Sequence, residues 1–183
     1  LMILNKHKKI LFLTGTRADF GKIKSLIQIL EKHPVFKVFV FVTGMHLLKK
    51  YGYTLLEIKR CGFKNVKKFK NHTHEDTMDL TLSKTIKGLS AYVKECKPDM
   101  IVIHGDRVEA LAGAIVGSLN NILVTHIEGG EISGTIDELI RHSTSKLSHL
   151  HFVSNQNAKQ RLIQMGELEN SIFVIGSPDV DIM

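Results

Sequence analysis

The chain has 183 residues, of which 43% are hydrophobic and 23% charged; these globular values exclude a disordered chain and allow one ordinary domain with its own core. The formal net charge is +7, but no nucleic-acid motif or aromatic-interleaved basic patch accompanies it, so we expect a solvated basic surface and no nucleic-acid partner. No apolar segment is long enough to span a membrane, and no membrane partner is expected.

The first strand candidate, residues 10–14, begins an alternation of short apolar runs with runs of helical period. The later strand candidates are residues 36–42, 66–69, 100–103, 122–127, 150–153 and 172–175. Strands buried on both faces read as continuous apolar runs, and their alternation with helices means right-handed βαβ units. The sequence therefore predicts an α/β fold with a doubly wound, Rossmann-like parallel sheet.

Three helices are expected where apolar residues recur at intervals of three and four. The first lies between the first two strands, the second ends before Pro98, and the third ends at Asn120-Asn121. Their apolar positions are Ile23, Leu26, Ile27 and Leu30; Leu82, Ile86, Leu89 and Val93; and Ala110, Leu111, Ala114 and Ile115.

The cysteines and the N-terminal residues bear on the cellular compartment. Cys61 and Cys96 are far apart and form no Cys-x-x-Cys pair, so nothing demands an oxidising compartment. The apolar run at residues 10–13 follows several lysines, but it is too short for a signal peptide and leads straight to Arg17 and Asp19. We therefore expect a cytoplasmic protein.

The loop after the first strand, residues 15–22, reads Gly-Thr-Arg-Ala-Asp-Phe-Gly-Lys, at the place where a Rossmann-type domain holds anions. Its spacing fits neither a Walker A loop nor Gly-x-Gly-x-x-Gly, so NAD is not expected, and no other cofactor is. Arg17 remains as a bidentate ligand for phosphate or carboxylate. The alternative interpretation makes Gly15 a tight turn, Asp19 a charge at the helix N-terminus and Lys22 a solvent-facing residue.

Three acidic residues, Asp106, Glu128 and Asp137, follow predicted strands. Open α/β sheets bind ligands outside the carboxyl ends of their strands, so these positions should converge on one crevice. Repulsion between neighbouring carboxylates separates their pKa values, which lets one act as an acid while another acts as a base. The pattern predicts proton-transfer chemistry.

Two of these carboxylates also have a plain structural interpretation, whereas Glu128 ends a strand and enters Gly129-Gly130, where the flexible backbone permits close approach to a ligand. Asp106 is a favoured N-cap for the helix that follows it, and Asp137 stands four residues before Arg141, the spacing of a surface ion pair. His104 and His126 each precede an acid by two residues, although a hydrogen-bonded core histidine is the commoner case. Three carboxylates on adjacent loops nevertheless favour a functional interpretation.

Residues 72–76 read His-Thr-His-Glu-Asp, which suggests a metal site at first sight. The segment leads into a helix, so capping and solvent exposure explain it more simply. No third ligand at a plausible spacing is evident, and no metal is expected.

Several motifs, in order along nearly the whole chain, resemble those of the hydrolysing branch of the UDP-N-acetylglucosamine 2-epimerase family. The branch is indicated by Arg-Ala-Asp after Gly-Thr, where non-hydrolysing relatives carry Arg-Pro-Glu, and by Gly-Gly-Glu after Glu128, where they carry Ala-Gly-Leu-Arg. The matching segments are Gly-Thr-Arg-Ala-Asp at 15–19, Thr-Gly-Met-His at 43–46, His-Gly-Asp-Arg-Val-Glu at 104–109, His-Ile-Glu-Gly-Gly-Glu at 126–131, residues 134–142, and Gly-Ser-Pro at 176–178.

The resemblance implies that residues 1–183 are the N-terminal Rossmann-like domain of a two-domain, GT-B-like enzyme whose C-terminal nucleotide-binding domain is absent from this chain. The sequence stops soon after a strand and a turn, as expected of a segment cut from something longer. Alone, it is expected to be inactive and to bind a UDP-sugar weakly. The resemblance also suggests a homodimer, with the helix that carries Leu82 to Val93 as a candidate interface.

The implied reaction converts UDP-N-acetylglucosamine to N-acetylmannosamine and UDP, as the opening step of sialic-acid biosynthesis. One side chain removes the C2 proton while UDP departs from C1, which gives a 2-acetamidoglucal; water then adds at C1 as a proton returns to the opposite face of C2. The resemblance assigns the acid–base roles to Asp106, Glu128 and Asp137, the diphosphate to Arg17, and supporting substrate contacts to Asp19, Arg107, His126 and Arg141.

Three alternatives remain open at this level. A non-hydrolysing epimerase would return UDP-N-acetylmannosamine instead of a free sugar. A close relative would act on a 2,4-diacetamido-trideoxy sugar carried by UDP or GDP. A non-catalytic nucleotide-sugar-binding domain would keep the fold without the reaction.

Overall fold

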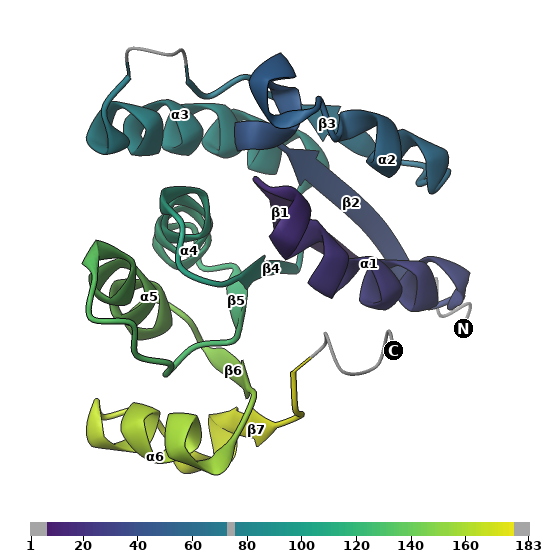
Figure 1. Ribbon diagram of the computed structural model, residues 1–183. Helices are drawn as coiled ribbons and strands as arrows, with labels where there is room; N and C mark the ends of the chain where they lie inside the picture. Colours follow the sequence, from purple (N-terminus) through teal and green to yellow (C-terminus); the bar gives the residue numbers. More distant parts are fainter. Residues whose placement is uncertain (1–6, 73–75, 178–183) are drawn as a thin grey trace, which may run out of the picture.

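The computed structural model describes residues 7–72 and 76–177, and within them seven parallel strands form one sheet in the order β3-β2-β1-β4-β5-β6-β7 (Figure 1). All seven predicted strands are confirmed, each to within two residues at either end. They are β1 (Lys8–Thr14), β2 (Phe36–Val42), β3 (Val66–Lys68), β4 (Met100–His104), β5 (Leu123–Ile127), β6 (Leu150–Val153) and β7 (Ile172–Val174).

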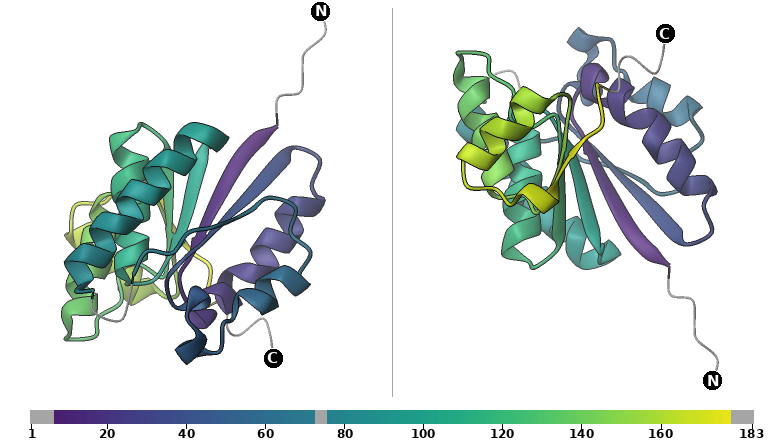
Figure 2. Two further views of the ribbon diagram at one scale, coloured as in Figure 1. Left: turned by 90° about the horizontal axis from the view of Figure 1, so that it is seen from above. Right: turned by 90° about the horizontal axis from the view of Figure 1, so that it is seen from below.

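The helices cover the two faces of the sheet unequally (Figure 2). Helices α1 and α2 lie on one face, and α3 to α6 lie on the other. The α-helices are α1 (Arg17–Lys32), α2 (Leu55–Arg60), α3 (Met78–Cys96), α4 (Val108–Leu119), α5 (Ile136–Lys146) and α6 (Gln156–Gln164); the 3₁₀ turns are η1 (Gly44–Leu47), η2 (Lys49–Tyr51) and η3 (Glu169–Ser171).

Two hydrophobic cores lie on opposite sides of the sheet, because side chains alternate along each strand. Leu11 and Leu13 of β1 pack with α3 and α4, whereas Ile10 and Phe12 pack with α1 and α2. The predicted α/β class with a doubly wound parallel sheet is therefore confirmed.

The strand order changes direction between β1 and β4, which pair with each other in parallel register. The connection after β1 leads to one side of the sheet and the connection after β4 leads to the other. Such a switch point opens a crevice at the carboxyl ends of the strands. The loops that carry the predicted site residues lie at this end.

Helix α4 approaches the sheet closely because it carries two glycines. A Cβ atom added at Gly117 would lie 2.3 Å from Val124 Cγ2, and one added at Gly113 would lie 2.5 Å from Ile103 Cγ2. Helix α4 precedes the strand that ends in the site, so these glycines help to set how closely α4 packs under the crevice.

The apolar positions of α3 that suggested a candidate dimer interface do not form an exposed stripe. Leu89 and Val93 are buried in the core, and Leu82 and Ile86 are only partly exposed. These apolar positions pack inward because α3 covers the sheet beside α4. The exposed apolar side chains of α3 are instead those of its first turn, Met78 and Leu80.

Two further findings close the description of the fold. Among residues 7–72 and 76–177, no helix is both long and apolar enough to cross a membrane. His74, Glu75 and Pro178, which belong to motifs discussed above, lie outside the described residues.

Candidate active site

A cleft of about 470 Å³ opens at the carboxyl ends of β1, β4 and β5. It brings six of the eight predicted site residues together and leaves Arg17 and His126 out of its lining. The six are Asp19, Asp106, Arg107, Glu128, Asp137 and Arg141, joined by Thr16, Ala18, Lys22, Met45, His104, Gly105 and Glu131.

Glu128 lies at the centre of a polar network in this cleft. Lys22 Nζ lies 2.7 Å from Oε2 and His104 Nε2 lies 3.1 Å from the same oxygen, while Ser177 donates a hydrogen bond to Oε1 at 3.0 Å. Burial would raise the pKa of Glu128, but the hydrogen bonds and charges of His104 and Lys22 outweigh it and lower the pKa to about 2. Glu128 is therefore ionised near neutral pH.

The backbone of Glu128 is as unusual as its partners. Its φ is 61°, in the left-handed region that a residue with a side chain rarely adopts. Strained backbone of this kind is found preferentially at functional sites, where the surroundings hold it in place.

Asp106 is paired with Arg141, which hydrogen-bonds the Asp106 carboxylate through Nη2 and the Glu131 carbonyl through Nη1 at 3.1 Å. Both structural interpretations of these residues are wrong. The N-cap of α4 is Arg107, and no side-chain hydrogen bond caps it. Among the described residues, Arg141 forms its ion pair with Asp106 and none with Asp137.

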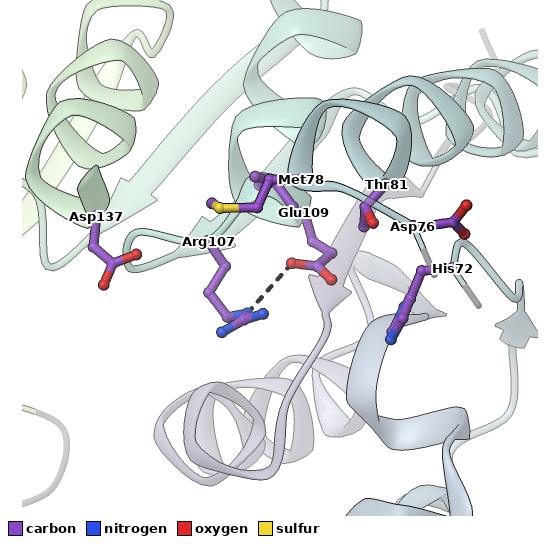
Figure 3. Close-up of a pocket in the computed structure, with 8 residues that line it drawn as sticks. His72, Asp76, Met78, Thr81, Arg107, Glu109 and Asp137 are labelled. Carbon is purple, nitrogen blue, oxygen red and sulfur yellow. Dashed lines mark ion pairs between the residues drawn. The ribbon is translucent and has the colours of Figure 1, made fainter. Parts of the chain in front are cut away.

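Asp137 lies in the first turn of α5 and is exposed. Its side chain faces both the cleft and a smaller neighbouring pocket, whose residues are drawn in Figure 3. Thr135 Oγ1 donates a long hydrogen bond of 3.5 Å to its carboxylate. Asp137 is therefore accessible to a ligand, unlike the two other predicted acids, which are tied into ion pairs.

His126 is fully buried behind the cleft rather than in its wall. Its Nε2 donates to the Gly105 carbonyl at 2.8 Å, and Nδ1 lies 3.0 Å from Ser145 Oγ. Burial lowers the pKa of His126 to about 3, so the ring is neutral. The structure thus places His126 as a brace for the turn that carries Asp106, not in contact with a ligand.

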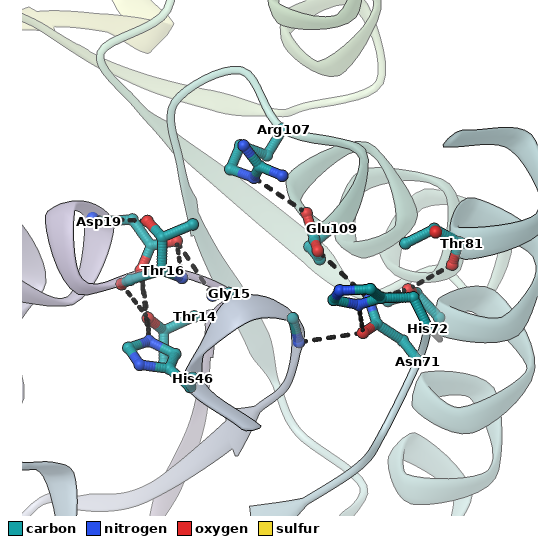
Figure 4. Close-up of polar contacts among 12 residues, drawn as sticks. Thr14, Gly15, Thr16, Asp19, His46, Asn71, His72, Thr81, Arg107 and Glu109 are labelled. Carbon is teal, nitrogen blue, oxygen red and sulfur yellow. Dashed lines mark hydrogen bonds and ion pairs between the residues drawn. The ribbon is translucent and has the colours of Figure 1, made fainter. Parts of the chain in front are cut away.

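Asp19 shapes the loop after β1 (Figure 4). Its carboxylate accepts hydrogen bonds from the amides of Gly15 and Thr16 at 3.0 and 2.9 Å and from the Thr14 hydroxyl, and it completes a capping box with Thr16. Burial raises the pKa of Asp19. Two amides that are candidates to hold an anion in such a loop are therefore already occupied.

His46 supports the same loop from below. Its Nε2 lies 2.9 Å from Thr14 Oγ1 and its Nδ1 lies 2.6 Å from Thr54 Oγ1, and the side chain is fully buried. Burial lowers the pKa of His46 to about 4, which keeps the ring neutral.

Arg17, the predicted diphosphate ligand, extends into solvent. Its side chain is 74% exposed and its Nε lies 3.3 Å from Glu57 Oε1. The structure therefore places the Arg17 side chain outside the lining of the cleft, although its neighbours Thr16 and Ala18 belong to that lining.

The sequence did not predict Lys22, His104 or Glu109 as site residues. Lys22 lies one helical turn after Asp19, on the face of α1 that lines the cleft, and not in solvent as the alternative interpretation held. His104 ends β4 and faces Glu128 across the sheet, not Asp106. Glu109 occurs in the motif that begins at His104, but only the structure shows that it is buried.

The cleft is lined by five carboxylates, beside one lysine and two arginines. Among residues 7–72 and 76–177, no group of three or more His, Cys, Asp or Glu side chains is placed to hold a metal ion. Carboxylates gathered at the switch point of a doubly wound sheet are an arrangement that can support proton transfer to and from a bound ligand.

Comparisons with known proteins identify the particular family. The model of the family described as UDP-N-acetylglucosamine 2-epimerase matches residues 28–183. The chain is 52% identical over 176 residues to a UDP-N-acetylglucosamine 2-epimerase of Neisseria meningitidis serogroup B, which covers 96% of this chain and 47% of that protein. It is 42% identical to a hydrolysing UDP-N,N'-diacetylbacillosamine 2-epimerase of Legionella pneumophila, over 95% of this chain and 47% of the relative.

A solved structure gives the same result. The Methanocaldococcus jannaschii UDP-GlcNAc 2-epimerase in complex with UDP-GlcNAc and UDP matches with a TM-score of 0.81 and 28% identity, over 92% of this chain and 46% of the other. The chain belongs to the UDP-N-acetylglucosamine 2-epimerase family, and its sheet corresponds to half of a GT-B-like epimerase. It spans about half the length of the curated relatives it matches.

Proposed function

We propose that this chain is the N-terminal domain of a hydrolysing 2-epimerase that converts UDP-N-acetylglucosamine to N-acetylmannosamine and UDP. The observation that carries the proposal is the convergence of Asp106, Glu128 and Asp137 on one cleft in a chain of this family. The Neisseria relative, at 52% identity, is named for UDP-N-acetylglucosamine. The proposed pathway is the synthesis of sialic-acid-type sugars.

Asp106, Glu128 and Asp137 are the proposed acids and bases that move protons on the two faces of C2. The hydrogen bonds and charges of His104 and Lys22 lower the pKa of Glu128, so this carboxylate is ionised near neutral pH. Lys22 and Arg141 supply positive charge where UDP leaves.

The proposal also covers the rest of the protein. We propose that a C-terminal domain closes the cleft and supplies most contacts to the nucleotide, since the relatives are about twice as long as this chain. We further propose a cytoplasmic homodimer. Light scattering coupled to gel filtration of the full-length protein tests the dimer: a monomeric mass would contradict it.

The test of the reaction is proton NMR of the full-length protein with UDP-N-acetylglucosamine in deuterated water. Free N-acetylmannosamine with deuterium at C2, together with UDP, is the expected result. Release of UDP-N-acetylmannosamine would identify a non-hydrolysing epimerase instead. The 183-residue chain, run in parallel, should give no turnover.

The second candidate substrate is a 2,4-diacetamido-trideoxy nucleotide sugar. It is favoured by the Legionella relative, whose name specifies UDP-N,N'-diacetylbacillosamine, at 42% identity. The same NMR experiment with that sugar nucleotide decides between the two. No reaction with either substrate, together with tight binding of UDP-sugar, would mean a non-catalytic binding domain.

A further inference from the structure

A smaller pocket of about 270 Å³ adjoins the cleft, and Arg107 and Asp137 line both (Figure 3). Its other walls come from His72 and Asp76, from Met78 and Thr81 at the start of α3, and from Val108 and Glu109 of α4. A ligand whose reacting carbon lies between the acids of the cleft can therefore extend a substituent past Asp137 into this pocket. None of the proton-transfer steps proposed above uses it.

Glu109 is the buried charge of this pocket, with a side chain that is only 4% exposed. It is wedged between two glycines: a Cβ atom added at Gly15 would lie 3.2 Å from Glu109 Cδ, and one added at Gly44 would lie 2.8 Å from Oε1. The loops after β1 and β2 thus leave just enough room for this carboxylate, and they hold it in one place.

One carboxylate oxygen of Glu109 accepts a hydrogen bond from the side-chain amide of Asn71, which other hydrogen bonds hold in place (Figure 4). Asn71 Nδ2 donates to Oε1 at 3.3 Å and to Thr85 Oγ1 at 2.9 Å, while Asn71 Oδ1 accepts from the Gly44 amide at 3.0 Å. Asn71 is 1% exposed. The orientation of the Glu109 carboxylate is therefore set in advance of any ligand.

The other oxygen, Oε2, has no hydrogen-bond donor among the residues that the structure describes. Arg107 Nε lies 3.4 Å away as an ion-pair partner, but no described residue donates a hydrogen bond to Oε2, although the atom is buried. An unsatisfied buried acceptor is destabilising, more so when it is charged, and such atoms are rare in folded proteins. A donor from a ligand in the pocket would remove this cost.

We propose that the pocket is a subsite for the C6 hydroxyl of the sugar, which donates a hydrogen bond to Glu109 Oε2. The inference rests on the proposed function. The C6 hydroxyl fits because it stands on a rotatable arm that extends from the ring. The 2,4-diacetamido-trideoxy sugar carries a methyl group there, which cannot donate, so Glu109 selects the hydroxylated sugar over the trideoxy one.

The test needs no variant at first. With the full-length wild-type protein, kcat/KM should fall about 10- to 100-fold from UDP-N-acetylglucosamine to its 6-deoxy analogue, the effect of losing a hydrogen bond to a charged group. The 4-deoxy analogue should lose less than about threefold. Equal turnover of the natural and the 6-deoxy substrate would overturn the subsite, and a loss confined to the 4-deoxy analogue would overturn the C6 assignment.

A variant of Glu109 shows whether this residue contacts the sugar directly or acts only by positioning Arg107. Glu109→Gln keeps the oxygen that faces Asn71 and replaces Oε2 by an amide, so kcat/KM on UDP-N-acetylglucosamine should fall about tenfold or more, while the 6-deoxy analogue should be unaffected. An equal loss on both substrates would show that Glu109 only positions Arg107. Arg107→Lys, the control, should lower both rates alike.

Failure of the proposed function would be recognised separately. If the wild-type protein releases no free sugar from UDP-N-acetylglucosamine, the reaction is wrong, and calorimetric titration still tests the subsite. UDP-N-acetylglucosamine should then bind more tightly than its 6-deoxy analogue to the wild type but not to Glu109→Gln. Equal affinities for the wild type would overturn the inference.

Discussion

Glu128 combines a left-handed backbone with a carboxylate that Lys22, His104 and Ser177 all contact. Glycine adopts this backbone without strain, whereas alanine keeps the Cβ clash. Glu128→Gly and Glu128→Ala both remove the carboxylate, but the glycine variant should be the more stable by about 1 kcal/mol. Urea unfolding of the 183-residue chain measures the difference.

Lys24 provides the matched control, because it is an exposed position within α1. Lys24→Gly should be less stable than Lys24→Ala by about 1 kcal/mol, the reverse order, since glycine disfavours a helix interior. The same order at both positions would show that Glu128 is not strained.

Asp137 is the acid that a substrate can reach most directly. Asp137→Asn removes its ability to accept or give a proton, so turnover of UDP-N-acetylglucosamine by the full-length protein should fall about 10²- to 10⁴-fold. Asp79→Asn, an exposed acid in the first turn of α3, should leave turnover unchanged. Normal turnover by Asp137→Asn would remove this residue from the mechanism.

At the scale of single residues, the sequence predicted which acids gather at the cleft but not how they pair. Sequence spacing placed Asp137 opposite Arg141, yet Arg141 reaches across to Asp106, 35 positions away. Such a pair depends on the relative placement of two loops, which no local period encodes. The burial of Glu109 was missed for the same reason, because it depends on two glycines in the loops after β1 and β2.

At the scale of elements, α4 shows how small residues decide the distance between a helix and the sheet. Gly117→Ala improves helix propensity but forces a methyl group against Val124, so it should destabilise the chain by about 1–3 kcal/mol. Gly21→Ala in α1 meets nothing within 4 Å and should stabilise it by about 0.5–1 kcal/mol. Thermal unfolding of both variants is the measurement; a stabilised Gly117→Ala would contradict the close approach.

The strands were the most predictable elements because most of them centre on a short apolar run bounded by turns, although β3 holds two lysines. Helix α1 was found from its period, and its predicted positions Ile23 and Ile27 are buried. Helix α6 escaped notice because Ala158 and Leu162 are the buried apolar residues among its nine. For α3, the apolar period identified the helix, and its predicted positions Leu89 and Val93 are buried. The period did not predict that Thr81 and Thr85 are buried as well.

At the scale of the whole molecule, buried histidines should make stability depend on pH. Burial lowers the pKa of His46 to about 4 and that of His126 to about 3. Below pH 6.5 these histidines bind protons in the unfolded chain but stay neutral in the folded chain. The free energy of unfolding is therefore greatest above pH 6.5 and falls as the pH drops toward 4. Between pH 6.5 and 5 each of these two buried histidines should lower the free energy of unfolding by about 2 kcal/mol.

Two carboxylates modify this profile at lower pH. The lowered pKa of Glu128 means that its contribution is complete above about pH 4.5 and is lost as the pH falls toward 2. The raised pKa of Asp19 acts in the opposite sense, because the folded chain binds that proton first. Urea unfolding at pH 7.5 and 5 measures the slope: His126→Asn should flatten it, and His7→Asn, at an exposed position, should not.

The two oxygens of Glu128 are held by different parts of the chain. Oε2 is anchored by Lys22 and His104 within the body of the domain, whereas Oε1 is held by Ser177, on the segment that leads away from β7. One carboxylate thereby joins the segment after β7 to α1 and β4, three parts of the chain that are far apart in the sequence.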